Sequence, residues 1–147
     1  MLLKVVLVRH SKRRHVGWSC AKTNLMEKRV GYMAASLCLS PDHEFRFMLI
    51  NQLQRDLQSP NHLQVCVGLI ALTNIGTKDM IPALMPSVVG AMSHKQPIVR
   101  KKAVMAMHHF WRMDPESVAG HTDHFQRILC DTDPAVMASG LHILMAL

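Results

Sequence analysis

Apolar residues recur along the chain with a helical period, and this pattern predicts helices from residue 24 to the C-terminus. Apolar positions three and four residues apart share one face of a helix, whereas a half-buried strand alternates at every second residue. No such alternation occurs in the 147 residues. Capping residues and first-turn prolines mark the boundaries of the predicted helices. The residues expected to start helices are Asn24, Asp42, Asn61, Pro97 and Pro134.

Two segments predict less regular helices. In the run MIPALMPSVVGAM, Pro82 and Pro86 suit an early helical turn better than the interior. We therefore expect this helix to begin late or to kink. Gly76 is expected to end the helix that begins at Asn61. Asp114 and Pro115 open a shorter segment that precedes the next helix.

One helical unit recurs along the chain. Val30, Val65, Val99 and Val136 occupy equivalent places, at spacings of 35, 34 and 37 residues. The same apolar face continues four and seven residues later, at Ala34, Leu69, Ala103 and Gly140, and then at Leu37, Leu72, Ala106 and Ile143. A second helix separates these units, at 42–58, about 79–92 and about 118–130. Such helix pairs bury their apolar faces only by stacking, so the sequence predicts an all-α, right-handed α-solenoid of HEAT/armadillo-like helix pairs.

The composition and charge divide the chain into two parts. Hydrophobic residues make up 49% of the chain, as expected for an ordered, core-rich domain. The net charge of +7 arises within residues 1–30, which hold eight Lys and Arg residues and one acid, while residues 31–147 are balanced. Nucleic-acid binding by the whole domain is therefore not indicated. We assign residues 1–22 to a basic leader, expected to be poorly ordered, and residues 23–147 to the solenoid.

The basic leader is open to three interpretations. A frayed or solvated tail is the ordinary one for a chain end of this kind. Its Arg-rich, acid-poor composition also fits a mitochondrial presequence. A third interpretation is direct binding of the leader to an anionic membrane.

The sequence offers little catalytic or metal-binding chemistry. It holds no GxSxG, P-loop or HExxH motif, so we expect neither an enzyme nor a cofactor. His121 and His124 could share a helical turn, with Cys130 further along, but structural zinc needs a complementary ligand pair that is absent, so no metal is expected. Asp131 and Asp133 lie at an inter-helix turn, where N-capping is the ordinary role. The widely spaced cysteines fit a reduced, intracellular compartment.

Three consecutive cations, Arg100, Lys101 and Lys102, stand inside the apolar run PIVRKKAVMAMHHFW. They form either the solvated side of a packed helix or a docking patch for an anionic surface. With Lys28 and Arg29, they are the candidate protein- or membrane-docking residues of the sequence. Both interpretations remain open at this point.

Several segments, in order, resemble the large subunits of heterotetrameric adaptor protein complexes, the adaptins. The segments are LMEKRVGYMAASL, LINQLQRDLQSPN, DMIPALMPSV, PIVRKKAV and ILCDTDPAVMASGLHIL. The resemblance covers residues 24–147, and the epsilon type is nearest, with the gamma type next. Residues 1–22 do not resemble the family. The phosphoinositide-binding lysine cluster of alpha-type adaptins lies upstream of the matching region, so no residue here inherits that role.

The resemblance implies a non-enzymatic structural subunit of a vesicle-coat adaptor complex, acting in intracellular protein transport and cargo sorting. The implied location is cytoplasmic, peripheral on trans-Golgi network or endosomal membranes. The implied partners are a beta-type large subunit, mu and sigma subunits and a GTP-loaded ARF-type GTPase, without nucleic acid. We expect further repeats or partner chains to cover the apolar end LHILMAL. The alternative is a generic HEAT/armadillo scaffold that binds peptide or cargo, although only Trp111 and Asn74 hint at the required Trp–Asn ladder.

Overall fold

The computed structural model describes residues 24–40 and 45–145 of the chain. Within these ranges the chain forms helices and short connections, without a strand. The predicted leader, residues 1–22, and the predicted cap Asp42 lie outside the described residues. The elements in chain order are α3 (Leu25–Cys38), α4 (Phe45–Leu57), α5 (His62–Ile75), the 3-10 turn η2 (Lys78–Met80), α6 (Ile81–Met92), α7 (Pro97–Met113), α8 (Pro115–Ala119), α9 (Thr122–Leu129) and α10 (Pro134–Leu144).

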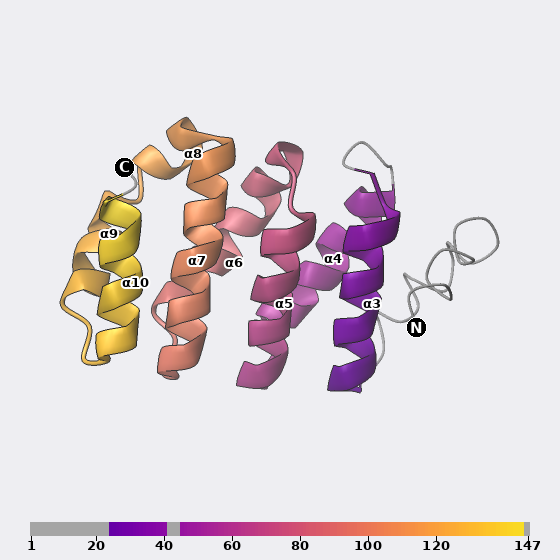
Figure 1. Ribbon diagram of the computed structural model, residues 1–147, viewed down its shortest axis with the longest axis horizontal. Helices are drawn as coiled ribbons and strands as arrows, with labels where there is room; N and C mark the ends of the chain where they lie inside the picture. The colour runs from indigo at the N-terminus through magenta and orange to yellow at the C-terminus, as the bar shows by residue number, and fades with distance from the viewer. Residues whose placement is uncertain (1–23, 41–44, 146–147) are drawn as a thin grey trace.

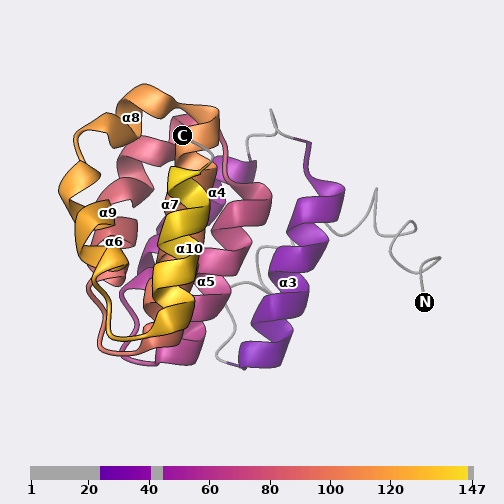
Figure 2. The same cartoon turned by 60° about the vertical axis from the view of Figure 1, so that its left-hand side comes forward.

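The helices are arranged in two layers. In Figure 1, α3, α5, α7 and α10 stand side by side, and α4, α6 and α9 lie behind them. Each front helix contacts the next, from α3 through α5 and α7 to α10, while α4 contacts α5 and α6 contacts α7. Figure 2 shows the same order after rotation, with α10 in front of α7. This stacking of helix pairs confirms the predicted all-α solenoid.

The predicted capping residues begin their helices as expected. Asn24 Oδ1 accepts a hydrogen bond from Met26 N at 3.0 Å at the start of α3. Asn61 Oδ1 accepts one from Leu63 N at 3.0 Å at the start of α5. Each of these caps satisfies an amide that has no acceptor within its own helix. The helix boundaries thus follow from local chemistry.

The expectation for the proline-containing helix was wrong in part. Pro82 does lie in the first turn of α6, but the helix begins at Ile81, and Pro86 is inside it. A proline at position 86 removes the amide that would donate to the carbonyl of residue 82, and its ring crowds that carbonyl. Since that loss falls in the first two turns, the helix starts early and accommodates the proline.

Three of the four predicted apolar faces are buried in the core. The buried residues are Val65, Leu69 and Leu72 on α5, Val99, Ala103 and Ala106 on α7, and Val136, Gly140 and Ile143 on α10. Gly140 is needed for close packing, since a Cβ added there would lie 2.7 Å from Ile128 Cγ2 on α9. The repeat that was read from the sequence therefore corresponds to one continuous core.

The predicted face of the first helix was wrong. Val30 is 59% exposed and Leu37 is 70% exposed on α3. The helix instead turns Lys28, Tyr32 and Ala35 into the core. Polar contacts explain this orientation of the helix. Lys28 and Tyr32 reach a carboxylate inside the protein that would otherwise lack these two hydrogen-bond donors.

That carboxylate belongs to Asp56 on α4, which is 0% exposed. Lys28 Nζ donates to Asp56 Oδ1 at 2.6 Å, and the Tyr32 hydroxyl donates to Oδ2 at 2.6 Å. The side-chain amides of Gln52 and Gln64 also donate to Oδ1, at 2.9 Å and 3.0 Å. A buried charge is tolerated only when it is paired and hydrogen-bonded. The network fixes the position of α3 against α4 and α5.

Candidate protein-docking surface

The five cations predicted to dock a partner have different environments. Lys28 is 3% exposed, and its ammonium is held by Asp56. The structure therefore gives Lys28 an internal role in place of the predicted docking role. Arg29, next to it, is exposed on α3 and stays a docking prediction.

Arg100 joins α7 to the turn before α10. Its Nε and Nη2 donate to the two carboxylate oxygens of Asp131 at 2.6 Å and 2.7 Å, and Nη1 donates to the backbone carbonyls of His94 and Lys95 at 2.9 Å and 3.1 Å. Such a two-pronged pair is strong and directional. Hydrogen bonding from Arg100 holds the pKa of Asp131 below its ordinary value. Arg100 is thus largely engaged within the protein.

The two predicted capping carboxylates have separate tasks. Asp133 Oδ1 accepts from the amides of Ala135 and Val136 at 2.8 Å and 3.3 Å, as expected for the N-cap of α10. Asp131 accepts an amide hydrogen bond from Asp133 N at 2.9 Å, and its main side-chain partner is Arg100, with a lesser hydrogen bond to Thr132. The capping prediction holds for Asp133, while the main partner of Asp131 is a guanidinium.

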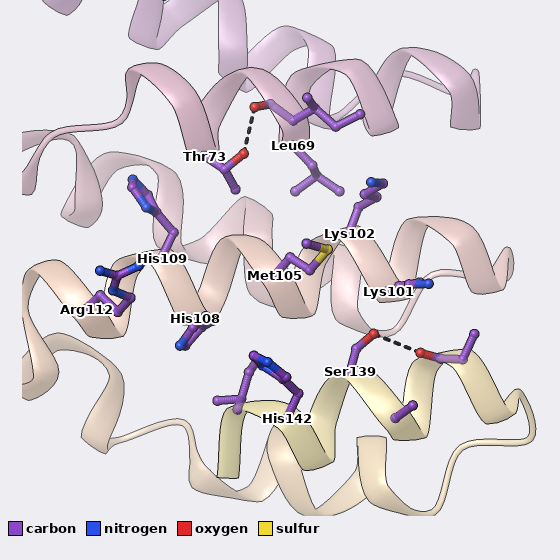
Figure 3. Close-up of a pocket in the computed structure, with 14 residues that line it drawn as sticks. Leu69, Thr73, Lys101, Lys102, Met105, His108, His109, Arg112, Ser139 and His142 are labelled. Carbon is purple, nitrogen blue, oxygen red and sulfur yellow. Dashed lines mark hydrogen bonds between the residues drawn. The ribbon is translucent and has the colours of Figure 1, made fainter. Parts of the chain in front are cut away.

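Lys101 and Lys102 line a groove between α5, α7 and α10, with a volume of about 690 Å³. Figure 3 shows the side chains that line it as sticks. The lining residues are Leu69, Ile70 and Thr73 from α5, Lys101, Lys102, Met105, His108, His109 and Arg112 from α7, and Ala135, Ala138, Ser139, His142 and Ile143 from α10. This volume is in the range of ordinary ligand pockets.

The polar character of the groove is basic. None of the described residues that line it is an aspartate or a glutamate. The two hydroxyls of the lining are already used, because Thr73 Oγ1 donates to the Ile70 carbonyl and Ser139 Oγ donates to the Ala135 carbonyl, each at 2.8 Å. The side-chain hydrogen-bond donors left to meet a ligand are therefore ammonium, guanidinium and imidazole groups.

Histidine rings form one end of the groove. His108 stacks on Trp111 with ring centroids 6.0 Å apart, and it meets His142 edge-on at 6.2 Å. Burial, with added repulsion from Arg112 and His142, lowers the pKa of His108. Burial also lowers the pKa of His109, as do Arg112 and His108, against an opposing backbone hydrogen bond with Gly76. The unliganded groove therefore disfavours a further positive charge on either ring.

Apolar side chains are exposed at both ends of the helix array. On α3 they form one stripe at helical spacing, made of Met26, Val30, Met33 and Leu37. On and after α10 they are Leu141, Leu144 and Met145. A contiguous exposed apolar surface of this kind marks an interaction site more often than an isolated side chain does.

Residues 24–40 and 45–145 contain neither a metal-ligand cluster nor a membrane-spanning helix. No group of three or more His, Cys, Asp or Glu side chains there could hold a metal ion. His121 and His124 have ring centroids 6.0 Å apart, without a third ligand group in that part of the chain. No helix in the same ranges has both the length and the apolar character needed to cross a bilayer.

Sequence reasoning found one half of the groove and missed the other. Lys101 and Lys102 were singled out as a cationic run. Arg112 and His108 follow at helical spacing on the same face of α7, and this periodicity could have indicated them. His142 comes from α10, and its place opposite His108 depends on tertiary packing.

Comparisons with known proteins identify relatives of this chain. Residues 19–147 match the family described as Adaptin N terminal region. The chain is 43% identical over 118 residues to the AP-4 complex subunit epsilon of Arabidopsis thaliana, covering 80% of this chain and 13% of that protein. It is 43% identical over 122 residues to the AP-4 complex subunit epsilon-1 of Homo sapiens, covering 83% of this chain and 11% of that protein. It is 32% identical over 120 residues to the AP-3 complex subunit delta-1 of Bos taurus, covering 82% of this chain and 10% of that protein.

A structural comparison gives the same fold. A chain in a homology model of the full-length AP-3 complex, in an intermediate open conformation, matches with a TM-score of 0.83 and 24% identity. The match covers 97% of this chain and 26% of that one. This chain spans about an eighth of the AP-4 complex subunit epsilon of Arabidopsis thaliana, at 13% of its length.

Proposed function

This chain belongs to the adaptin family, and we propose that it serves as a structural, non-enzymatic subunit of a vesicle-coat adaptor complex. It would act in intracellular protein transport and cargo sorting, as part of an adaptor trunk. The partners would be a beta-type large subunit and mu and sigma subunits. The epsilon-type relatives, at 43% identity, support an assembly of the AP-4 kind.

The exposed apolar stripe of α3 carries this proposal within the structure. Its four side chains, Met26, Val30, Met33 and Leu37, are exposed, on the side of α3 away from its contact with α5. Burying apolar surface contributes about 25 cal/mol per Å², so a partner that covers the stripe would be held mainly by the hydrophobic effect. A stacked solenoid offers such long surfaces to several partners at once.

The proposed location is cytoplasmic and peripheral on trans-Golgi network or endosomal membranes. Recruitment would be indirect, through the assembled complex and a GTP-loaded ARF-type GTPase. Exposed cations such as Arg29 would add weak attraction to an anionic leaflet, worth about 1 kcal/mol each near the surface. The generic peptide-binding scaffold receives less support, because Trp111 is partly buried against His108 and Asn74 lies on a different helix.

Mass spectrometry of the proteins that co-purify with the tagged chain from cells tests the proposal. We expect a beta-type large subunit together with mu and sigma subunits. Met33→Glu combined with Leu37→Glu should remove that enrichment, because two carboxylates would stand in the apolar stripe. The matched control carries Gln58→Glu and Gln126→Glu, at exposed polar positions away from the stripe. Recovery of chaperones without adaptor subunits from folded wild-type chain would contradict the proposal.

A further inference from the structure

We propose that the groove between α5, α7 and α10 binds an acidic peptide segment of a partner protein, with carboxylates at both ends of the segment and apolar side chains between them. The proposal concerns the ligand of this groove, and it does not depend on adaptor assembly.

The arrangement of charge along α7 defines the two ends of the segment. Lys101 and Lys102 lie at one end of the groove, and Arg112 lies at the other, as Figure 3 shows. His108 and His142 face each other near the Arg112 end. With no aspartate or glutamate among the described lining residues, the groove presents uncompensated positive charge to a ligand. Carboxylates are the complementary groups, and charge-assisted hydrogen bonds to them are strong.

The middle of the groove is apolar. Met105 lies on α7 between the two cationic ends, with Ile70 on α5 and Ala138 on α10 among the other lining residues. Met105 is 48% exposed, so its side chain is available to a ligand. Methionine adapts its shape to different apolar partners. This region therefore suits one or two apolar side chains of the bound segment.

The length of the groove fits an extended peptide. Lys101 and Arg112 are eleven residues apart on one continuous helix. With a rise of about 1.5 Å per residue, the two cationic ends are separated by about 16 Å along the axis. An extended chain advances about 3.3 Å per residue, so about five residues span this distance. A short linear segment can therefore contact both ends at once.

The layout favours a peptide over a membrane lipid. A single phosphate headgroup is compact and is best held by cations that converge on one point, whereas these cations lie at two ends with an apolar stretch between them. His109 is recessed, with its Nε2 buried in the structure. A flat bilayer surface would meet the groove rim and leave this floor uncovered.

The direct test is a binding titration with the full 147-residue chain. The probe is a fluorescein-labelled peptide of about eight residues, with two glutamates at each end and leucine and alanine between them, followed by fluorescence anisotropy. We expect saturable binding that weakens as sodium chloride rises, because exposed charges are screened. A second peptide with glutamine in place of every glutamate should bind at least about tenfold more weakly.

Charge-reversal variants locate the binding. Lys101→Glu combined with Lys102→Glu should weaken binding of the acidic peptide at least about tenfold. The matched control combines Lys95→Glu with Arg127→Glu, which makes the same change in net charge at exposed positions outside the groove. We expect less than about a twofold change in the control. Equal loss in both variants would mean attraction to the overall positive charge, and it would overturn the proposal.

A third variant leaves the net charge of the chain unchanged. A folding defect caused by charge reversal therefore cannot explain its effect on peptide binding. Ala138→Trp places a large ring on the exposed face of α10 that lines the groove, and it should weaken peptide binding by about fivefold or more. Vesicles of phosphatidylcholine with phosphatidylserine form the competing arm. Binding to these vesicles that is lost on reversing Lys101 and Lys102, with no peptide binding, would assign the groove to a membrane and overturn the proposal. Unchanged peptide binding in the tryptophan variant would overturn it as well.

Discussion

Asp56 shows how one residue can determine the orientation of a whole helix. Its carboxylate is fully buried and receives four side-chain hydrogen bonds, from Lys28, Tyr32, Gln52 and Gln64. These donors come from three helices, so the carboxylate acts as a junction. Replacing it leaves a buried ammonium without its counter-charge, which is much costlier than losing one neutral hydrogen bond.

We therefore expect Asp56→Ala to lower the free energy of unfolding by about 3–5 kcal/mol. Urea denaturation followed by circular dichroism measures this change. The comparison variant is Tyr32→Phe, which removes one hydroxyl from the same network and should cost about 1–2 kcal/mol. Similar losses for the two variants would show that the uncompensated Lys28 charge is not the dominant effect.

His109 makes the stability depend on pH. Its pKa is lowered mainly by burial and by Arg112, so the unfolded chain takes up a proton at a higher pH than the folded chain does. Above the ordinary value of about 6.5 the ring is neutral in both states. As the pH falls below that value, proton uptake favours the unfolded state, and stability declines.

We expect His109→Gln to flatten the decline in unfolding free energy between about pH 7 and pH 5. Urea titrations of wild type and variant at a series of pH values give the two slopes. If the slopes are the same, protonation of His109 does not contribute to the acid sensitivity of the fold.

At the scale of helices, close approach is set by small residues. Gly140 lies inside α10, where an added Cβ would meet Ile128 Cγ2 at 2.7 Å. Gly90 lies inside α6, where an added Cβ would have no atom within 4 Å among the described residues. The same substitution at these two sites therefore separates helix propensity from packing.

Gly90→Ala should stabilise the protein by about 0.5–1 kcal/mol, because alanine loses less backbone entropy in a helix than glycine does. Gly140→Ala gains the same propensity, but the β-branched methyl of Ile128 must shift, at a cost of about 1–3 kcal/mol. We expect a net loss of about 1 kcal/mol for this variant. Thermal or urea unfolding of both variants gives the signs, and a stabilised Gly140→Ala protein would contradict the close approach.

Helix positions were predictable because they depend on local residues. Asn24, Asn61 and Asp133 cap the helices that follow them, and this chemistry extends over two or three residues. The face of α3 was not predictable in this way. The predicted face of Val30 and Leu37 is regularly spaced, but Asp56, which lies 28 residues from Lys28, turns the face of Lys28 inward instead. The opposite wall of the groove, which contains His142, likewise depends on how α10 packs on α7.

At the scale of the whole molecule, the solenoid has apolar surface at both ends of its helix array. Figure 1 shows α3 and α10 at opposite ends of the row of helices. The stripe lies on α3, and the exposed apolar residues Leu141 and Leu144 lie on α10. Neighbouring units in a solenoid bury such surfaces against each other. A partner at either end would therefore make apolar packing contacts. Contacts of the same kind already join α3 to α5 and α7 to α10.

From these exposed ends we expect the isolated chain to self-associate as its concentration rises. The apolar stripe of α3 is a surface that water solvates poorly, and two copies can cover it mutually. Analytical ultracentrifugation over a range of concentrations should show an increasing weight-average mass for wild type. Met33→Glu combined with Leu37→Glu should shift the chain towards monomer, while the Gln58→Glu and Gln126→Glu control should behave as wild type. A wild-type chain that stays monomeric at all concentrations would mean that the stripe binds apolar protein surface too weakly to hold a partner. The adaptor interface would then have to lie elsewhere on the solenoid.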